Sequence, residues 1–249
     1  MSPDSPLAAE FHASPNHGER RGGPADAIVL HYTGMPTGDA ALALLCASDS
    51  GVSCHYLVWE DGRIWQLAPE SRRAWHAGKS FWAGETDINS RSIGIEIVNA
   101  GHDGGAPPYP DAQVEAVIAL VRDIAQRLGI RPERILGHSD IAPARKSDPG
   151  EYFPWRRLHE AGLGHWMAPA PIRPGPSYAQ GAMGPPVAAI QHMLAAYGYD
   201  VVPTGLFDER TRDAVAAFQR HFRPERIDGV ADASTLETLR ALLAALPAR

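Results

Sequence analysis

Residues 135–150 read Ile135-Leu136-Gly137-His138-Ser139-Asp140-Ile141-Ala142-Pro143-Ala144-Arg145-Lys146-Ser147-Asp148-Pro149-Gly150. The apolar start predicts a strand that delivers His138 into a loop rich in titratable side chains. Lys146 and Asp148 are two positions apart, so in an extended segment they project to the same side. Imidazole and carboxylate are both good Zn²⁺ ligands, but a catalytic zinc needs three protein ligands and one open position. We therefore expect a third ligand from elsewhere in the chain.

A second histidine follows another predicted strand. The apolar run Ala27-Ile28-Val29-Leu30 leads into His31, which repeats the layout at His138. His31, His138 and Asp148 together meet the catalytic-zinc requirement and leave the fourth position for water. Spacing alone leaves an alternative, in which His31 is an ordinary surface histidine and Lys146 and Asp148 form a surface ion pair.

Two further residues are placed to act on a substrate at such a site. Residues 92–99 alternate like a strand, which puts Glu96 on the face opposite Ile95 and Ile97. A carboxylate there is suited to taking the proton of the attacking water, and Lys146 is suited to stabilising an oxyanion. These are the parts of an amide hydrolase, although a strand glutamate can equally face solvent without any role.

The remaining patterns predict an α/β domain over residues 26–167, with a mixed central β-sheet flanked by helices. Residues 56–60 and 63–67 flank Asp61-Gly62, a dipeptide typical of two-residue hairpin turns. Residues 39–47 are rich in Ala and Leu and predict a helix. Residues 110–128 carry apolar side chains at helical spacing, and Gly129 ends that helix.

The ends of the chain differ from this domain in composition. Residues 1–25 are rich in Pro, Gly, Ser and charge, and we expect a flexible N-terminal lead-in without the apolar core of a signal peptide. Residues 168–186 form a Pro/Gly-rich segment that predicts a stiff linker between separable domains. Residues 187–249 contain three helical patterns, at 187–197, 211–222 and 234–246, and predict a small all-α domain.

The overall composition excludes several classes of protein. The 249 residues carry 29 acidic and 23 basic side chains, a net charge of −6 that argues against a nucleic-acid-binding surface. No run of about 18 apolar residues is present, so we expect no membrane span. Cys46 and Cys54 allow at most one disulfide, and two unpaired thiols are the expected state. These features predict a soluble cytoplasmic protein, with a periplasmic or envelope-associated one as the alternative; no pattern indicates an oligomeric state.

Several separated motifs between residues 25 and 166 closely resemble the zinc-dependent N-acetylmuramoyl-L-alanine amidases of the AmpD/AmiD type. The motifs are His31-Tyr32-Thr33, Ser53-Cys54-His55-Tyr56-Leu57-Val58, Trp75-His76-Ala77-Gly78-Lys79-Ser80, Asn89, Ser92-Ile93-Gly94-Ile95-Glu96, Gly137-His138-Ser139-Asp140-Ile141 and Arg145-Lys146-Ser147-Asp148-Pro149-Gly150. In that family the residues matching His31, His138 and Asp148 bind one zinc ion. The residue matching Glu96 is the catalytic acid/base, and the one matching Lys146 assists at the transition state. Contacts with substrate are expected from His55, Trp75, His76, Asn89 and Arg145.

The C-terminal patterns look like the three-helix peptidoglycan-binding domain. The matching stretches are Val187-Ala188-Ala189-Ile190-Gln191-His192-Met193-Leu194, Gly198-Tyr199, Gly205-Leu206-Phe207-Asp208, Thr211, Ala214-Val215-Ala216-Ala217-Phe218-Gln219 and Asp228-Gly229-Val230. Its glycines and aspartates are mainly structural and serve turns and helix caps. The chain departs from the pattern at Ala231-Asp232, where the family usually has a second glycine.

The resemblance implies a peptidoglycan amidase that hydrolyses the amide between the muramoyl lactyl group and L-alanine. Its partner would be peptidoglycan or a soluble (anhydro-)muropeptide from peptidoglycan recycling. Two alternatives are a non-catalytic peptidoglycan recognition protein on the same fold and a zinc peptidase acting on the stem peptide. The presence of all three ligand residues argues against the first alternative.

Overall fold

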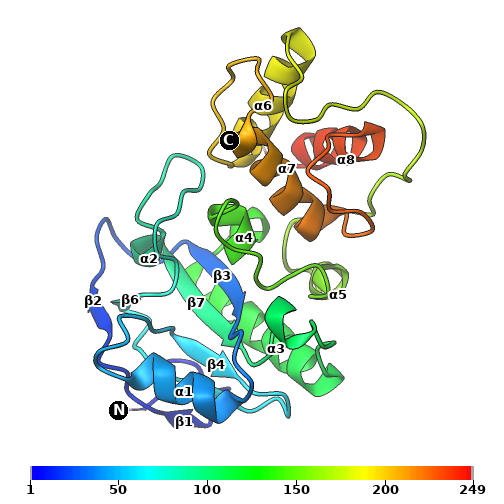
Figure 1. The fold of residues 1–249 in the computed structure, drawn as a ribbon. Helices are drawn as coiled ribbons and strands as arrows, with labels where there is room; N and C mark the ends of the chain where they lie inside the picture. Colours follow the sequence, from blue (N-terminus) through cyan, green and yellow to red (C-terminus); the bar gives the residue numbers. More distant parts are fainter. Residues whose placement is uncertain (1, 248–249) are drawn as a thin grey trace.

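The computed structural model describes residues 2–247, which form an α/β domain followed by a three-helix domain (Figure 1). The strands are β1 (Glu10–Phe11), β2 (His17–Glu19), β3 (Ala27–Tyr32), β4 (Tyr56–Val58), β5 (Ile64–Gln66), β6 (Arg72–Ala74), β7 (Ser92–Ile97) and β8 (Ile135–Gly137). The helices are α1 (Gly38–Cys46), α2 (Ile88–Arg91), α3 (Asp111–Leu128), α4 (His138–Ile141), α5 (Trp155–Glu160), α6 (Pro185–Tyr197), α7 (Glu209–Phe222) and α8 (Ala233–Ala244), with 3₁₀ turns η1 (His102–Gly104) and η2 (Pro132–Arg134).

A six-stranded mixed sheet in the order β1-β5-β4-β7-β3-β8 forms the centre of the first domain. β4, β7, β3 and β8 are parallel to one another, whereas β5 is antiparallel to β4. The register aligns His31 with Glu96, and Leu30 with Gly137, the residue before His138. Because the carboxyl ends of parallel strands share one edge of a sheet, the side chains of His31, Glu96 and His138 meet at that edge.

Helix α3 covers one face of this sheet. The strand residues that pack with it occupy alternate positions of β3 and β7: Ile28, Leu30, Ile93, Ile95 and Ile97. His31 and Glu96 lie at the intervening positions and so belong to the opposite face. The predicted α/β class, the hairpin around Asp61-Gly62 and the helix that ends at Gly129 are therefore confirmed, and Gly129 adopts a left-handed conformation at the helix end.

The expectation of a flexible lead-in is wrong for residues 2–25. β1 pairs in parallel with β5, and β2 pairs with β6 in a separate two-stranded sheet. Ser14 and Asn16 are buried, and their side chains donate hydrogen bonds to the carbonyls of Leu45 and Ala47. Strands of two or three residues depend on backbone hydrogen bonds to a sheet edge, and a polar composition neither prevents these bonds nor reveals them.

The C-terminal domain consists of α6, α7 and α8 around a buried apolar core. Asp208 and Asp232 cap α7 and α8 by accepting hydrogen bonds from the backbone N–H groups of Thr211 and Thr235. The buried Gln219 side chain is bonded to the loop before α8, with its amide donating to the Val230 carbonyl. No helix in the described part of the chain is long and apolar enough to cross a membrane.

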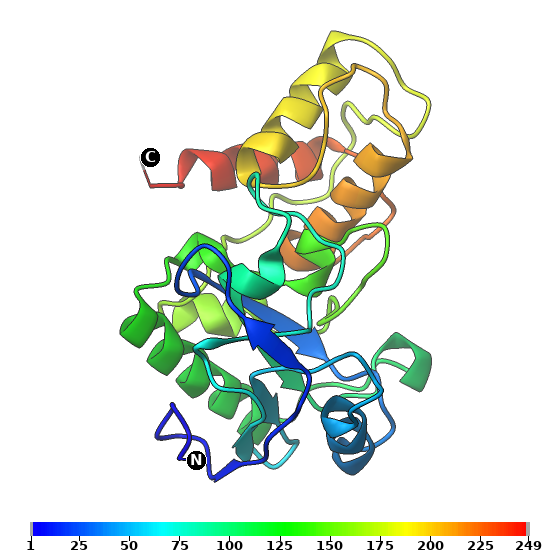
Figure 2. The same ribbon diagram turned by 90° about the vertical axis from the view of Figure 1, so that its left-hand side faces the viewer.

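The two domains are in direct contact, and α7 lies beside α4 in both views (Figures 1 and 2). One apolar cluster joins Leu136 and Ile141 of the first domain to Tyr199 and Phe222 of the second. The segment predicted as a stiff linker lies against α8. The backbone N–H of Ala170 donates to the Thr238 hydroxyl, and its carbonyl accepts from the Ser234 hydroxyl. The predicted linker over residues 168–186 thus connects two domains that touch each other, because proline and glycine disfavour helices but do not prevent packing.

Candidate metal centre and active site

Three elements bring the predicted ligands together. His31 is near the carboxyl end of β3, and His138 is the first residue of α4, directly after β8. The sequence predicted a loop at His138, but the chain turns into a short helix there. Asp148 follows in the loop after α4, and its backbone carbonyl accepts a hydrogen bond of 2.9 Å from the N–H of Ser139. All three ligand residues are buried.

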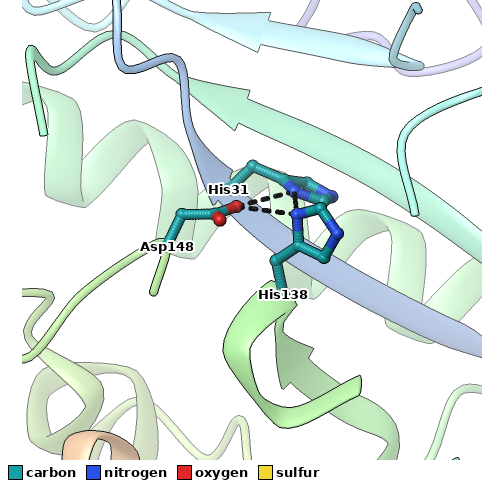
Figure 3. A group of neighbouring side chains, drawn as sticks. All are labelled: His31, His138 and Asp148. Carbon is teal, nitrogen blue, oxygen red and sulfur yellow. Dashed lines mark hydrogen bonds and ion pairs between the residues drawn. The ribbon is translucent and has the colours of Figure 1, made fainter. Parts of the chain in front are cut away.

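The ligand atoms of His31, His138 and Asp148 converge on one point (Figure 3). The two Nδ1 atoms are 2.9 Å apart, and Asp148 Oδ2 lies 2.9 Å from His31 Nδ1 and 3.0 Å from His138 Nδ1. Such close spacing is favourable only if a proton or a cation lies between these atoms. The protonation of the two rings therefore decides what the site holds.

A chain of hydrogen bonds indicates the tautomer of His31. The Ser92 hydroxyl donates to the Ile88 carbonyl, so its oxygen is free to accept from Nε2 of His76 at 3.2 Å. His76 Nδ1 is then an acceptor, and it lies 3.0 Å from His31 Nε2. His31 consequently carries its proton on Nε2, and its Nδ1 lone pair points into the site.

His138 has the same tautomer for a different reason. Its Nε2 lies 3.1 Å from the Ala77 carbonyl oxygen, which can only accept a hydrogen bond. The Nδ1 lone pair of His138 is thus directed at the Nδ1 lone pair of His31 and at the Asp148 carboxylate. Three electron-pair donors without a proton among them could hold a cation, and two imidazoles with one carboxylate are a known ligand set for catalytic zinc.

The electrostatics of the ligands agree with this assignment. Burial and, to a smaller extent, the neighbouring His138 lower the pKa of His31 to about 4, so His31 is neutral at pH 7. Burial opposes ionisation of Asp148, but in the metal-free site ring protons of His138 and His31 that face the carboxylate more than offset this and hold the pKa of the Asp148 carboxyl well below its usual range. Both groups are therefore in the form that binds a metal.

Glu96 lines the same cavity as the three ligands. Its Oε2 is buried and has no hydrogen-bond partner among the described residues. Burial raises the pKa of the Glu96 carboxyl well above its usual range, and the charge of Asp148 adds to the rise. A carboxyl group with a raised pKa and a free oxygen is suited to accepting and returning a proton near neutral pH.

The cavity has a volume of about 360 Å³, and Lys146 and Arg145 lie at its rim. The Arg145 guanidinium donates to the carbonyls of Ala77 and Lys79 at 2.8 Å each, which ties it to the loop after β6. Lys146 is exposed, and its ammonium has no hydrogen bond or ion pair within residues 2–247. Of these two cations, Lys146 is the one left free to approach a bound substrate.

The residues predicted to contact substrate fall into two groups. Trp75, His76 and Arg145 line the cavity, whereas His55 and Asn89 do not. His55 is fully buried behind the site, where its Nδ1 accepts from the Gly94 N–H at 2.9 Å. The Asn89 side chain accepts from the backbone N–H groups of His76 and Ala77. His55 and Asn89 thus lie behind the cavity in this structure and support the loop that carries His76.

Sequence reasoning missed the hydrogen-bond chain from His31 to Ser92. The signal for it was Gly94, because a Cβ at this position would lie 2.4 Å from Cγ of His76. A residue without a side chain is needed there so that the His76 ring can cross β7. A second missed group is Tyr32, His102 and Ser147, whose side chains bond one another beside the cavity.

A buried pair of imidazoles with a carboxylate, a glutamate with a free oxygen and a lysine on one cavity define a hydrolase site that could hold a metal ion. The chain belongs to the N-acetylmuramoyl-L-alanine amidase family, whose model matches residues 21–151. A peptidoglycan binding domain model matches residues 183–239. Both resemblances found in the sequence are thereby confirmed, and the enzyme class is N-acetylmuramoyl-L-alanine amidase.

Named relatives agree with the family. The chain is 44% identical over 230 residues to N-acetylmuramoyl-L-alanine amidase AmiD of Escherichia coli, a match covering 87% of this chain and 81% of AmiD. It is 40% identical over 139 residues to 1,6-anhydro-N-acetylmuramyl-L-alanine amidase AmpD of Enterobacter cloacae, covering 55% of this chain and 71% of AmpD.

Solved structures of relatives share the two-domain fold. Escherichia coli AmiD, in complex with anhydro-N-acetylmuramic acid-L-Ala-D-gamma-Glu-L-Lys, matches with a TM-score of 0.76 and 38% identity over 92% of this chain and 97% of that chain. AmpDh3 of Pseudomonas aeruginosa matches with a TM-score of 0.77 and 35% identity over 92% of this chain and 94% of that chain.

Proposed function

We propose that this amidase uses one zinc ion held by His31, His138 and Asp148 to cleave the bond between the N-acetylmuramoyl lactyl group and L-alanine. The observation that carries the proposal is the convergence of three electron-pair donors within 2.9–3.0 Å of one another. Zinc bound there would polarise the amide carbonyl and acidify the attacking water. The reaction consumes one water and releases the lactyl carboxylate and the free amine of L-alanine.

The chain's own residues supply the proton transfer and charge stabilisation. Glu96 takes a proton from the attacking water and gives it to the leaving nitrogen of L-alanine, which its raised pKa favours. Lys146 stabilises the negative charge that develops on the amide oxygen, since its ammonium stands at the cavity rim without another partner. Arg145, Trp75 and the apolar side of α1 form the walls that receive the muropeptide.

The experiment that tests this proposal combines metal analysis with product analysis. The purified chain should contain one zinc per molecule, and a chelator should abolish the activity until zinc is added back. Mass spectrometry of a digested muropeptide should show free stem peptide beginning with L-alanine. Cleavage within the stem peptide would instead indicate a zinc peptidase, and full activity of His138→Ala at wild-type zinc content would refute the ligand assignment.

We further propose that the substrate is a soluble anhydro-muropeptide and that the enzyme acts in the cytoplasm, in peptidoglycan recycling. Two observations support this: the solved AmiD and AmpDh3 complexes contain anhydro-muropeptides, and Cys46 and Cys54 are free thiols. Rates on purified sacculi and on anhydro-muropeptide, measured side by side, test the substrate. Fractionation of cells that express the native protein tests the compartment.

A further inference from the structure

The contact between the two domains is built around the buried carboxylate of Asp140 in α4, two residues after His138. Asp140 Oδ1 accepts from the Tyr199 hydroxyl at 2.8 Å, and Oδ2 lies 2.7 Å from Nδ1 of His221 on α7. Oδ2 also accepts from the Gly137 N–H at 2.8 Å. Asp140 is 1% exposed, so the C-terminal domain supplies two of the three partners of a fully buried acid.

The imidazole of His221 is itself held in place by both domains. It stacks on Trp155 of α5 with ring centroids 3.6 Å apart, and on Phe222 at 3.8 Å. Arg220, the preceding residue of α7, lies 3.6 Å from Glu151, whose other contact is His102 Nε2 at 3.0 Å. Helix α7 thus contacts both α4, which begins with the ligand His138, and Glu151, which lies three residues after the ligand Asp148.

The loop that orients the two histidine ligands is docked on the same domain. Trp82 packs edge-on against Tyr199, and the Ala83 N–H donates to the Gly198 carbonyl at 2.8 Å. This loop carries His76 and Ala77, which accept the Nε2 protons of His31 and His138. Both the ligand helix and the orienting loop therefore rest on α7 and the Tyr199 segment.

The four residues of α4 are too few to form a stable helix without external contacts. Its backbone also holds the third ligand, since Ser139 N–H is bonded to the Asp148 carbonyl. A shift of α4 would consequently move His138 and Asp148 together. A buried carboxylate that loses a partner is strongly unfavourable, so removal of Tyr199 or His221 bonds would drive such a shift.

We propose that the C-terminal domain is part of the catalytic unit, in which Tyr199 and His221 hold α4 through Asp140 and are positioning residues for the zinc ligands His138 and Asp148. This role is additional to any binding of the cell wall by that domain. The inference rests on the proposed zinc site, and the test therefore measures zinc binding directly as well as catalysis.

The test compares full-length Tyr199→Phe, His221→Leu and the double variant with the wild-type chain. Zinc affinity is measured by competition with a chromogenic chelator, and kcat and KM are measured on a soluble muropeptide at saturating zinc. Loss of groups that orient ligands typically weakens metal affinity or activity 10–100-fold, and we expect about 10-fold in the dissociation constant of the double variant because the effect passes through a helix. KM should stay unchanged, whereas kcat should fall.

Matched controls separate positioning from general destabilisation. Tyr178→Phe and His192→Leu make the same chemical changes on the C-terminal domain outside the Asp140 contact, and they should bind zinc like the wild type. His221→Asn keeps an N–H donor at the position of Nδ1 and should restore most of the affinity. If the double variant does not fold, as judged by circular dichroism, Tyr199→Phe, which removes a single oxygen atom, decides the question with an expected loss of about 3-fold.

One result would overturn the positioning role, and another would refute the zinc site itself. A wild-type zinc affinity and kcat in Tyr199→Phe and in the folded double variant would overturn the positioning role and leave the contact as a purely structural one. Absence of zinc from the wild-type chain would instead refute the ligand assignment on which the inference rests.

Discussion

Glu96→Gln is expected to remove most of the activity and to leave both the fold and the metal site intact. Glutamine has the same shape but cannot accept and return a proton, and general acid–base groups typically contribute about 10²–10⁴-fold to rate. That range corresponds to about 3–5 kcal/mol in the activation free energy. Zinc content should be unchanged, because Glu96 Oε2 is not among the three converging ligand atoms.

The same substitution should not lower the stability of the metal-free chain. Burial raises the pKa of the Glu96 carboxyl in the folded state, so above its usual pKa the folded chain binds more protons than the unfolded chain. The contribution of this group to stability is therefore greatest at low pH and falls as pH rises toward the folded-state pKa. Glutamine removes this dependence, and thermal unfolding of the chelator-treated variant at pH 8 should occur at the wild-type temperature or above.

The assay pairs steady-state rates on a muropeptide with metal analysis and thermal unfolding. Glu60→Gln, at an exposed hairpin position, is the matched control and should behave like the wild type in all three measurements. Loss of zinc together with activity would show that Glu96 is a ligand or a structural residue. A rate within a few-fold of wild type would remove Glu96 from the mechanism.

Three further predictions concern single residues. Lys146→Ala should lower kcat by about 10²–10³-fold with KM and zinc content unchanged. Lys146→Arg should restore only part of the lost kcat. A raised KM at constant kcat would assign Lys146 to substrate binding. Gly94→Ala should destabilise the fold by about 1–3 kcal/mol in urea unfolding, because its Cβ would lie 2.4 Å from His76 Cγ; wild-type stability would show that the ring moves freely. Burial, with a contribution from Arg20, lowers the pKa of His55 to about 3, so only the unfolded chain gains this proton as pH falls below about 6.5. Stability should therefore fall by about 2 kcal/mol from this group between pH 7 and pH 5, and equal pH slopes for His55→Gln and the wild type in urea unfolding would contradict this.

Local sequence patterns predicted most of the elements that position the site. The runs that became β3 and β7 and the periodicity of α3 depend on near neighbours, as do the caps of the C-terminal helices. The pattern failed where structure depends on distant partners. β1 and β2 exist because β5 and β6 offer backbone groups to them, and no side-chain periodicity can form over two or three residues.

The candidate site was predicted in part for a similar reason. Two strand-end histidines and an aspartate were recognisable from spacing and from the family motifs. The role of His76 was not, because it depends on the register that brings Ser92 and Gly94 beneath its ring. The contact between Asp140 and His221 joins residues 81 positions apart, and neither belongs to a pattern that indicates the other.

The same geometry explains why so many buried polar groups lie near this site. Three electron-pair donors directed at one point repel one another in the absence of a cation, and burial removes the water that would weaken this repulsion. Each histidine ligand is held in this unfavourable arrangement by a hydrogen bond that its other ring nitrogen donates, to His76 Nδ1 for His31 and to the Ala77 carbonyl for His138. The polar contacts around the ligands therefore hold an arrangement that is suited to metal binding, and the packing of α3 and of the C-terminal helices supplies the free energy that maintains it.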